Sequence, residues 1–238
     1  MIIVGATLAP YVMKNEGTWG SWLHTAEALR SSVGDRNDAT EVRFFAALET
    51  DARGEKPFAP LIERLDALGG VRWTFSVRDD ATTWNGGSRL HRICTGRNLI
   101  SHYAMATQAS HVLFLDADMC PPSDCLPKLL EMRYPLVGGH VPTYGLRGPR
   151  VDGYGYDVQE HMNTAGFLLV ERRLFVRLRW RTDVDAGMTD DPCYHADASD
   201  LGYPTHVRHD VVCAHYPAAI PPIEHRHSEQ VRTIHVRS

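Results

Sequence analysis

Two carboxylates stand directly after an apolar run in the segment HVLFLDADM, His111 to Met119. The four apolar residues from Val112 to Leu115 predict a strand buried on both faces, and open α/β sheets bind ligands where such strands end. Alternate residues of an extended chain point the same way, so we expect Asp116 and Asp118 to share a direction. Their charges repel unless a cation lies between them, and carboxylate oxygens suit Mg²⁺ or Mn²⁺. The segment therefore predicts a divalent metal site that faces an anion such as a phosphate.

A second acidic pair lies in the stretch Thr189-Asp190-Asp191-Pro192, which is typical of a helix start. Thr189 suits the N-cap, the two acids suit the positive end of the helix, and Pro192 is tolerated in the first turn. A carboxylate at this point could also serve as a general base towards a hydroxyl group. Spacing alone favours the capping role over catalysis.

Histidine and cysteine offer further ligands near the predicted last strand. His215 ends that strand and could complete a Mn²⁺ site, although a lone histidine is a weak signal. The rival arrangement is a zinc site made by the pairs Cys193/His195 and Cys213/His215. The spacing inside each pair is shorter than usual, and on a helix Cys193 and His195 would point to nearly opposite faces. Zinc is therefore the weaker alternative.

Arg97 and Asn98 lie on the helix predicted just before the metal strand. The planar fork of an arginine suits a diphosphate group. A solvated helix face would explain the same two residues equally well, so both interpretations stay open at this point.

The elements that position these residues alternate between strand and helix along the chain. Strands or extended stretches are expected at residues 2–4, 41–48, 71–77, 112–115, 135–144, 165–170 and 207–214. Helices are expected at residues 18–33, 58–68, 88–109, 124–133, 172–178 and 190–201, the last ending at Gly202. This order predicts one α/β domain with a mostly parallel central sheet flanked by helices.

Composition limits the classes of protein to consider. The 238 residues suit one large α/β domain, and the net charge of -4 argues against a general nucleic-acid binder. No apolar run approaches the roughly 18 residues of a membrane span, and the first residues show neither a basic leader nor a cleavage pattern. Five cysteines at irregular spacing predict a reducing compartment. We therefore expect a cytoplasmic protein without a transmembrane segment.

Taken together, the chain resembles the GT-A glycosyltransferases, most closely the family-two type. The resemblance covers about residues 1–216 and rests on motifs in the family's order. These are GRNLI (Gly96 to Ile100), HVLFLDADM, NTAGFLLVERRLF (Asn163 to Phe175), TDDPCYHADASDLGY (Thr189 to Tyr203) and VVCAHY, which contains His215. It implies a GT-A fold with a nucleotide-sugar half at 1–118, an acceptor half at 119–216 and a tail or lid at 217–238.

The resemblance also implies roles for single residues. Asp118 would bind Mn²⁺ or Mg²⁺ directly, Asp116 would bind it through water or contact the ribose, and His215 would complete the ligands. Asp191 would be the base of an inverting enzyme, and Asp190 a helper that binds the acceptor hydroxyl. The nucleotide-sugar would contact Thr7, Ala9, Pro10, Arg97, Asp116 and Ala117. The sugar and acceptor side would include Asn163, Ala165 and Gly166.

The implied activity is metal-dependent transfer of a sugar from a nucleotide-diphosphate sugar, UDP- or GDP-linked, to an acceptor hydroxyl. The family usually carries an acid after the second strand that reads uracil. Here Glu49 and Asp51 are the only acids near that position, and Asp79 and Asp80 follow the third strand, so the nucleobase stays open. The acceptor is open as well: the acidic charge weighs against DNA, whereas the His- and Arg-rich tail keeps a modified base among the candidates. Alternatives are a retaining GT-A enzyme, a nucleotidyltransferase and a non-catalytic nucleotide-sugar-binding module.

Overall fold

The computed structural model describes the chain in several stretches. They are residues 1–8, 29, 41–50, 62–63, 66–67, 71–77, 87–117, 119–141, 166–183, 185 and 188–215. The helices predicted at 18–33 and 58–68 lie mostly outside these residues, and the tail at 217–238 lies wholly outside them. Five predicted site residues are also outside, namely Ala9, Pro10, Asp118, Asn163 and Ala165.

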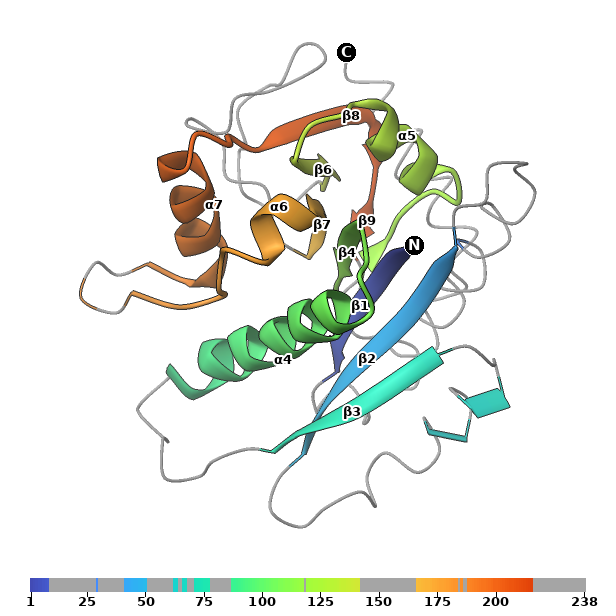
Figure 1. Cartoon of the computed structure of the whole chain (residues 1–238), viewed down its shortest axis with the longest axis vertical. Helices are drawn as coiled ribbons and strands as arrows, with labels where there is room; N and C mark the ends of the chain where they lie inside the picture. The colour runs from blue at the N-terminus through green and yellow to red at the C-terminus, as the bar shows by residue number, and fades with distance from the viewer. Residues whose placement is uncertain are drawn as a thin grey trace.

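A seven-stranded sheet runs through the described part of the molecule in the order β3-β2-β1-β4-β7-β6-β8 (Figure 1). Its strands are β1 (Ile2–Leu8), β2 (Val42–Thr50), β3 (Val71–Val77), β4 (His111–Leu115), β6 (Leu136–His140), β7 (Phe167–Glu171) and β8 (His206–Val212). The β7 strand is antiparallel to both of its neighbours, whereas the other pairs are parallel. The predicted α/β class with a mostly parallel sheet is therefore confirmed.

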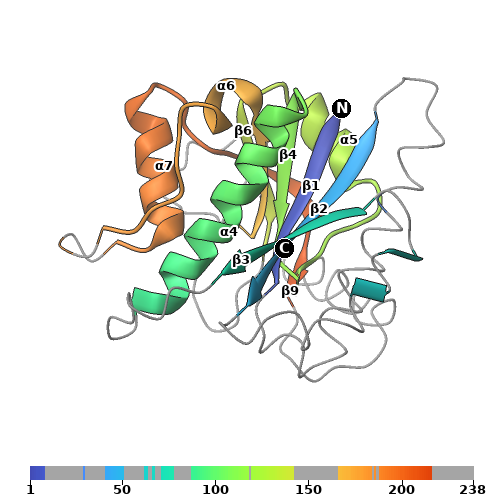
Figure 2. The ribbon, with the colours of Figure 1, turned by 60° about the horizontal axis from the view of Figure 1, so that its bottom comes forward.

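Two short strands form a separate antiparallel pair just past the end of β4. They are β5 (Met119–Cys120) and β9 (Ala214–His215), and Met119 is the partner of His215. In Figure 2 β9 lies at the end of the sheet where β1 ends. The backbone of His215 is thus brought to the region that directly follows the Asp-x-Asp strand.

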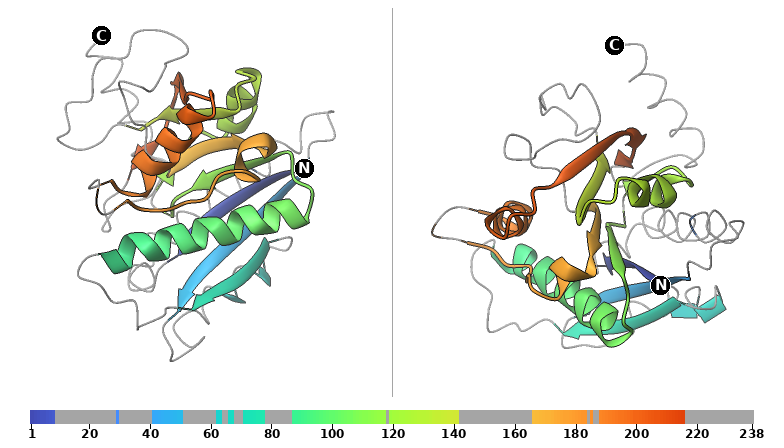
Figure 3. Two further views of the ribbon diagram at one scale, coloured as in Figure 1. Left: turned by 60° about the vertical axis from the view of Figure 1, so that its left-hand side comes forward. Right: turned by 45° about the horizontal axis from the view of Figure 1, so that its top comes forward.

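Helices cover both faces of the sheet. They are α4 (Gly87–Ala106), α5 (Cys125–Glu131), α6 (Arg172–Phe175) and α7 (Asp190–Asp200). The right panel of Figure 3 shows α4, α6 and α7 on one side of the strands and α5 on the other. Alternate residues of β4 supply the two cores: Val112 and Phe114 pack on the α4 side, and Leu113 and Leu115 on the α5 side. This confirms a strand buried on both faces.

The helix ends show where capping signals held and where they did not. The helix α7 begins at Asp190 as predicted, but Thr189 at its N-cap makes no side-chain capping hydrogen bond. Thr189 therefore occupies the predicted N-cap position but leaves the first backbone amides of the helix without a hydroxyl partner from its side chain. Gly202 follows the helix with φ of 83°, a left-handed conformation that glycine adopts without steric cost. None of the described helices combines the length and apolar character needed to cross a membrane.

Candidate active site

Arg97 joins three acidic side chains that come from two distant parts of the sequence. Its Nη1 donates hydrogen bonds to Asp190 Oδ2 at 2.6 Å and to Asp191 Oδ1 at 2.8 Å. Its Nη2 donates to the two carboxylate oxygens of Asp116 at 3.3 Å and 3.2 Å. The end of β4 and the start of α7 therefore meet at one guanidinium group, and the two acidic motifs of the sequence form one site.

Two glycines allow the close approach that builds this site. A Cβ on Gly96 of α4 would lie 2.6 Å from the Cγ2 of Thr7, so only glycine lets the helix pack this closely on the end of β1. A Cβ on Gly166 would lie 2.6 Å from Asp116 Oδ2, and the Gly166 carbonyl accepts the Asp116 amide hydrogen bond at 2.8 Å. Gly166, predicted on the acceptor side, thus lies directly against Asp116.

Burial sets the charge behaviour of the cluster. Arg97 is only 3% exposed and Asp190 only 5%. Burial alone would lower the pKa of Arg97, but the carboxylates of Asp116, Asp191 and Asp190 outweigh it and raise that pKa. Burial raises the pKa of Asp190 above its ordinary value, and the neighbouring carboxylate of Asp191 adds to this shift, whereas Arg97 opposes it.

The two acids of α7 differ in their access to solvent. The Asp191 side chain is 26% exposed, whereas that of Asp190 is 7% exposed. Asp191 can therefore reach a molecule bound above the site while it keeps one hydrogen bond to Arg97. Asp190 is nearly fully buried and bonded to the guanidinium. This geometry suits Asp191 for proton transfer and Asp190 for support.

Among the side chains that the sequence motifs imply as ligands of a divalent cation, the structure describes only that of Asp116. Three carboxyl groups share the single positive charge of Arg97 at the end of β4, so the site favours a further cation. The backbone of His215 lies opposite Met119, next in sequence to Asp118. Within the described stretches no group of three or more His, Cys, Asp or Glu could hold a metal ion, and Asp118 and the His215 side chain lie outside them. Carboxylate and imidazole donors together suit Mn²⁺.

The cysteines and histidine of the alternative zinc site have separate partners. Cys193 Sγ contacts the Met188 carbonyl at 4.0 Å, whereas Cys213 Sγ contacts Met119 Sδ at 3.9 Å. His195 Nδ1 lies 2.6 Å from Thr205 Oγ1. No metal-binding group of three or more such side chains exists among the described residues, so these contacts give the zinc arrangement no support.

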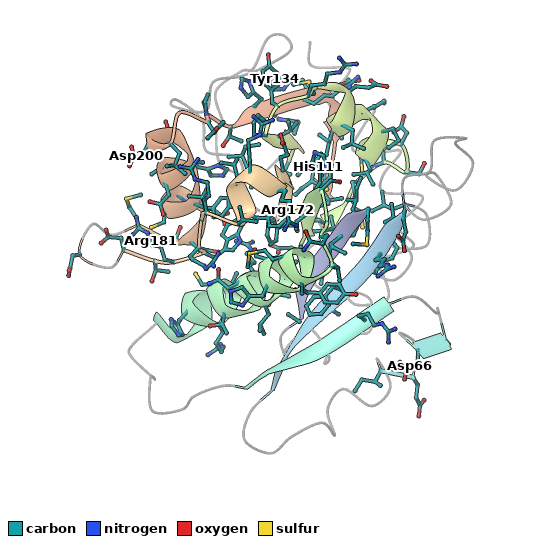
Figure 4. The ribbon with its side chains drawn as sticks, in the orientation of Figure 1. Asp66, His111, Tyr134, Arg172, Arg181 and Asp200 are labelled. Carbon is teal, nitrogen blue, oxygen red and sulfur yellow. The ribbon has the colours of Figure 1, made fainter. Side chains whose placement is uncertain are left out.

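Two further residues that are predicted to contact the nucleotide-sugar lie at the same end of the sheet. Thr7 is near the end of β1, and Ala117 follows Asp116 and is 5% exposed. Sequence reasoning missed Trp180, whose indole ring lies over Arg97 with 4.7 Å from the guanidinium carbon to the ring centroid. The sequence could have indicated Trp180 only as a tryptophan that comes shortly before the acidic pair, in a segment that belongs to no helix or strand. Figure 4 labels the neighbouring Arg181, which lies beside α7.

Comparison with known proteins gives matches at the level of structure. No protein-family model and no curated protein sequence matches the chain. The mannosyltransferase PcManGT from Pyrobaculum calidifontis, solved in complex with GDP-Man and Mn²⁺, is similar over 94% of this chain and 59% of its own, with a TM-score of 0.57 and 15% identity. GalNAc-T7, solved with UDP, GalNAc and Mn²⁺, is similar over 92% of this chain and 44% of its own, with a TM-score of 0.52 and 10% identity.

These likenesses concern the fold. The chain spans 59% and 44% of the lengths of the two glycosyltransferases, and the identities are too low to carry an activity across. The structure has the GT-A type of α/β fold that was predicted from the sequence motifs. Membership of the family-two type and inversion at the anomeric carbon stay predictions.

Proposed function

We propose that this chain is a metal-dependent glycosyltransferase that moves a sugar from a UDP- or GDP-linked donor to an acceptor hydroxyl with inversion. One observation carries the proposal: Arg97 brings the Asp190–Asp191 pair of α7 to Asp116 at the end of β4. In open α/β sheets this end is where nucleotides bind. A candidate base therefore lies beside the place where a donor diphosphate would be held. The likeness in fold to two glycosyltransferases solved with nucleotide and Mn²⁺ supports the same conclusion.

The site residues divide the work between donor and acceptor. Asp118, Asp116 and His215 would hold Mn²⁺ or Mg²⁺, which when bound neutralises charge on the departing nucleoside diphosphate. The contacts to the nucleotide-sugar donor would come from Thr7, Ala9, Pro10, Arg97, Asp116 and Ala117. Asn163, Ala165 and Gly166 line the side of the sugar and acceptor.

Asp191 acts as the general base. Its carboxylate removes the proton of the acceptor hydroxyl, and the oxygen attacks the anomeric carbon on the face opposite the leaving diphosphate. The transition state is oxocarbenium-like, as in other glycosyl transfer. Asp190 stays bound to Arg97 through Oδ2, and its other carboxyl oxygen accepts a hydrogen bond from the incoming hydroxyl. The greater exposure of Asp191, 26% against 7% for Asp190, supports this division of roles.

Release of nucleoside diphosphate from a panel of nucleotide-sugars with Mn²⁺ tests the proposal. We expect Asp118→Ala to abolish metal-dependent turnover and Asp191→Asn to keep donor binding while it loses transfer. Asp197→Asn is the matched control, because Asp197 lies on the same helix and pairs with Arg181 at the surface. Unchanged turnover in Asp191→Asn would leave that residue a helix-end acid and nothing more.

The same assay separates the alternatives. NMR of the first-formed product gives its anomeric configuration. A product with the same configuration as the donor would show a retaining enzyme, and the assignment of Asp191 as the base of an inverting reaction would fail. Donor binding without any turnover would indicate a binding module. Release of pyrophosphate from a nucleoside triphosphate would indicate a nucleotidyltransferase.

A further inference from the structure

Asn98, the residue after Arg97, holds the backbone of Trp180 at both of its polar groups. Asn98 Nδ2 donates to the Trp180 carbonyl at 2.9 Å, and the Trp180 amide donates to Asn98 Oδ1 at 3.0 Å. The side-chain amide of asparagine has one NH₂ donor group and one carbonyl acceptor, so its donor pairs with the backbone carbonyl and its acceptor with the backbone amide. This pair of bonds attaches the segment between α6 and α7 to the middle of α4.

The ring of Trp180 is held in turn and contacts both parts of the acidic cluster. It stacks on Tyr194 of α7 with centroids 3.8 Å apart and an angle of 10° between the planes. Phe114 of β4 meets it edge-on at 4.9 Å. The Arg97 guanidinium lies over the same ring at 4.7 Å, a distance at which a cation is attracted to the aromatic face. Trp180 therefore contacts both the cation and the helix that carries the acids.

We propose that Asn98 and Trp180 are positioning residues for the catalytic base, and that they act through Arg97. An arginine side chain has several rotatable bonds, so a fixed guanidinium needs neighbours that limit its freedom. Trp180 packs against the guanidinium, and Asn98 fixes Trp180. The two Nη1 hydrogen bonds, at 2.6 Å and 2.8 Å, then hold the Asp190 and Asp191 carboxylates in place. This inference rests on the proposed function, because it assigns the base to Asp191.

A purely structural role for Asn98 would predict a different result. It would lower thermal stability and leave the chemical step alone, as the loss of any buried hydrogen bond does. A positioning role lowers kcat more than it changes donor KM, because the shorter Arg97 bonds hold the two acids of α7 and small misplacements of catalytic groups cost up to about 100-fold in rate. The two roles therefore separate in kinetics.

The experiment compares four single variants with the wild type. Asn98→Ala and Trp180→Leu should lower kcat by roughly 10- to 100-fold, a larger change than the one in donor KM. Trp180→Phe keeps an aromatic face for Arg97 and should restore kcat to within a few-fold of the wild type. Ser101→Ala is the matched control: Ser101 is buried on the same helix, donates a hydrogen bond to the Arg97 carbonyl at 3.1 Å, and should leave kcat unchanged. Full kcat in Asn98→Ala with a lowered melting temperature would overturn the proposal.

A second measurement separates failure of this inference from failure of the proposed function. If the wild type turns over no nucleotide-sugar, the glycosyltransferase assignment fails. The contact between Trp180 and Arg97 is then tested by the melting temperatures of variants. The double variant Trp180→Leu/Arg97→Met should then lose less in melting temperature than the sum of the two single losses, because each substitution removes the same cation–aromatic contact. Strict additivity would overturn the link between Trp180 and Arg97.

Discussion

Arg97 and Asp190 form a buried ion pair at 2.6 Å although 93 positions separate them in the sequence. Asp191 and Asp116 share the same guanidinium, so one cation holds two acidic motifs together. Such a cluster is stable only while its cation is present, since unpaired buried carboxylates are costly. Arg97 is thus both the structural link between β4 and α7 and the residue that sets the charge of the site.

Replacing Arg97 by methionine should destabilise the protein strongly. The substitution leaves three carboxylates without their shared cation, and breaking a buried pair from one side costs about 3–5 kcal/mol. Chemical unfolding at pH 7 measures this loss directly. Arg97→Lys keeps the charge but not the planar fork, so we expect it to retain part of the stability.

Arg181→Met is the control for that prediction. Arg181 also makes two hydrogen bonds to a carboxylate of α7, that of Asp197, at 2.9 Å and 2.7 Å. Its side chain is 46% exposed, however, and exposed pairs contribute about 0–1 kcal/mol. Equal losses of stability in the Arg97 and Arg181 variants would show that burial of the Arg97 cluster has no energetic consequence.

Gly166→Ala should impair the metal and donor site more than it impairs the fold. The new methyl group would lie 2.6 Å from Asp116 Oδ2 and 3.0 Å from the Met119 Cε, so the Asp116 carboxylate must move. We expect Mn²⁺-dependent donor binding, measured by calorimetry, to weaken by tenfold or more. Gly202→Ala is a useful comparison, since a Cβ there meets nothing within 4 Å and is disfavoured only by the positive φ of 83°. Normal donor binding by Gly166→Ala would contradict the close approach.

Much of the sheet could be predicted because its strands are short and distinctly patterned. Residues 71–77 alternate apolar and polar side chains, and β3 occupies that range. The uninterrupted apolar run 112–115 forms the central strand β4 between β1 and β7. The direction of β7 was not predicted, because periodicity marks a strand without stating which way it pairs. Phe167–Glu171 pairs antiparallel with both neighbours, and only the path of the chain determines that.

The partners of Arg97 could not be read from its local sequence. A solvated helix face and a diphosphate contact explained the GRNLI segment equally well, and the structure instead places Arg97 against three carboxylates. The prediction that it contacts the nucleotide-sugar stays untested. Trp180 could not be predicted for a related reason. It lies outside the helices and strands, and its contacts with Asn98 and Tyr194 arise from tertiary packing.

The stability of Asp190→Asn relative to the wild type should depend on pH. Burial raises the pKa of Asp190, against the opposing effect of Arg97. A carboxyl group whose pKa is higher in the folded state stabilises the fold fully below its unfolded pKa of about 3.9, and that contribution is lost as the pH rises through the folded value. The asparagine variant has no such dependence. The melting temperature of Asp190→Asn should therefore rise relative to that of the wild type as the pH increases from about 4 to 7. A difference that stays constant, or that changes in the opposite direction, would sink this assignment.

The cysteines should be unreactive in the folded protein. All five cysteines of the chain are buried and free, and burial, aided by the charge of Asp190, raises the pKa of Cys94 to about 12. Because the thiolate is the reactive form, DTNB at pH 8 should label less than one thiol per native chain and five after unfolding in guanidinium. The same shift makes Cys94 favour the folded state below the ordinary thiol pKa of about 8.5, and this contribution declines as the pH rises towards about 12. Rapid labelling of a thiol in the native protein, with the melting temperature unchanged, would show that the burial assigned to these side chains is wrong.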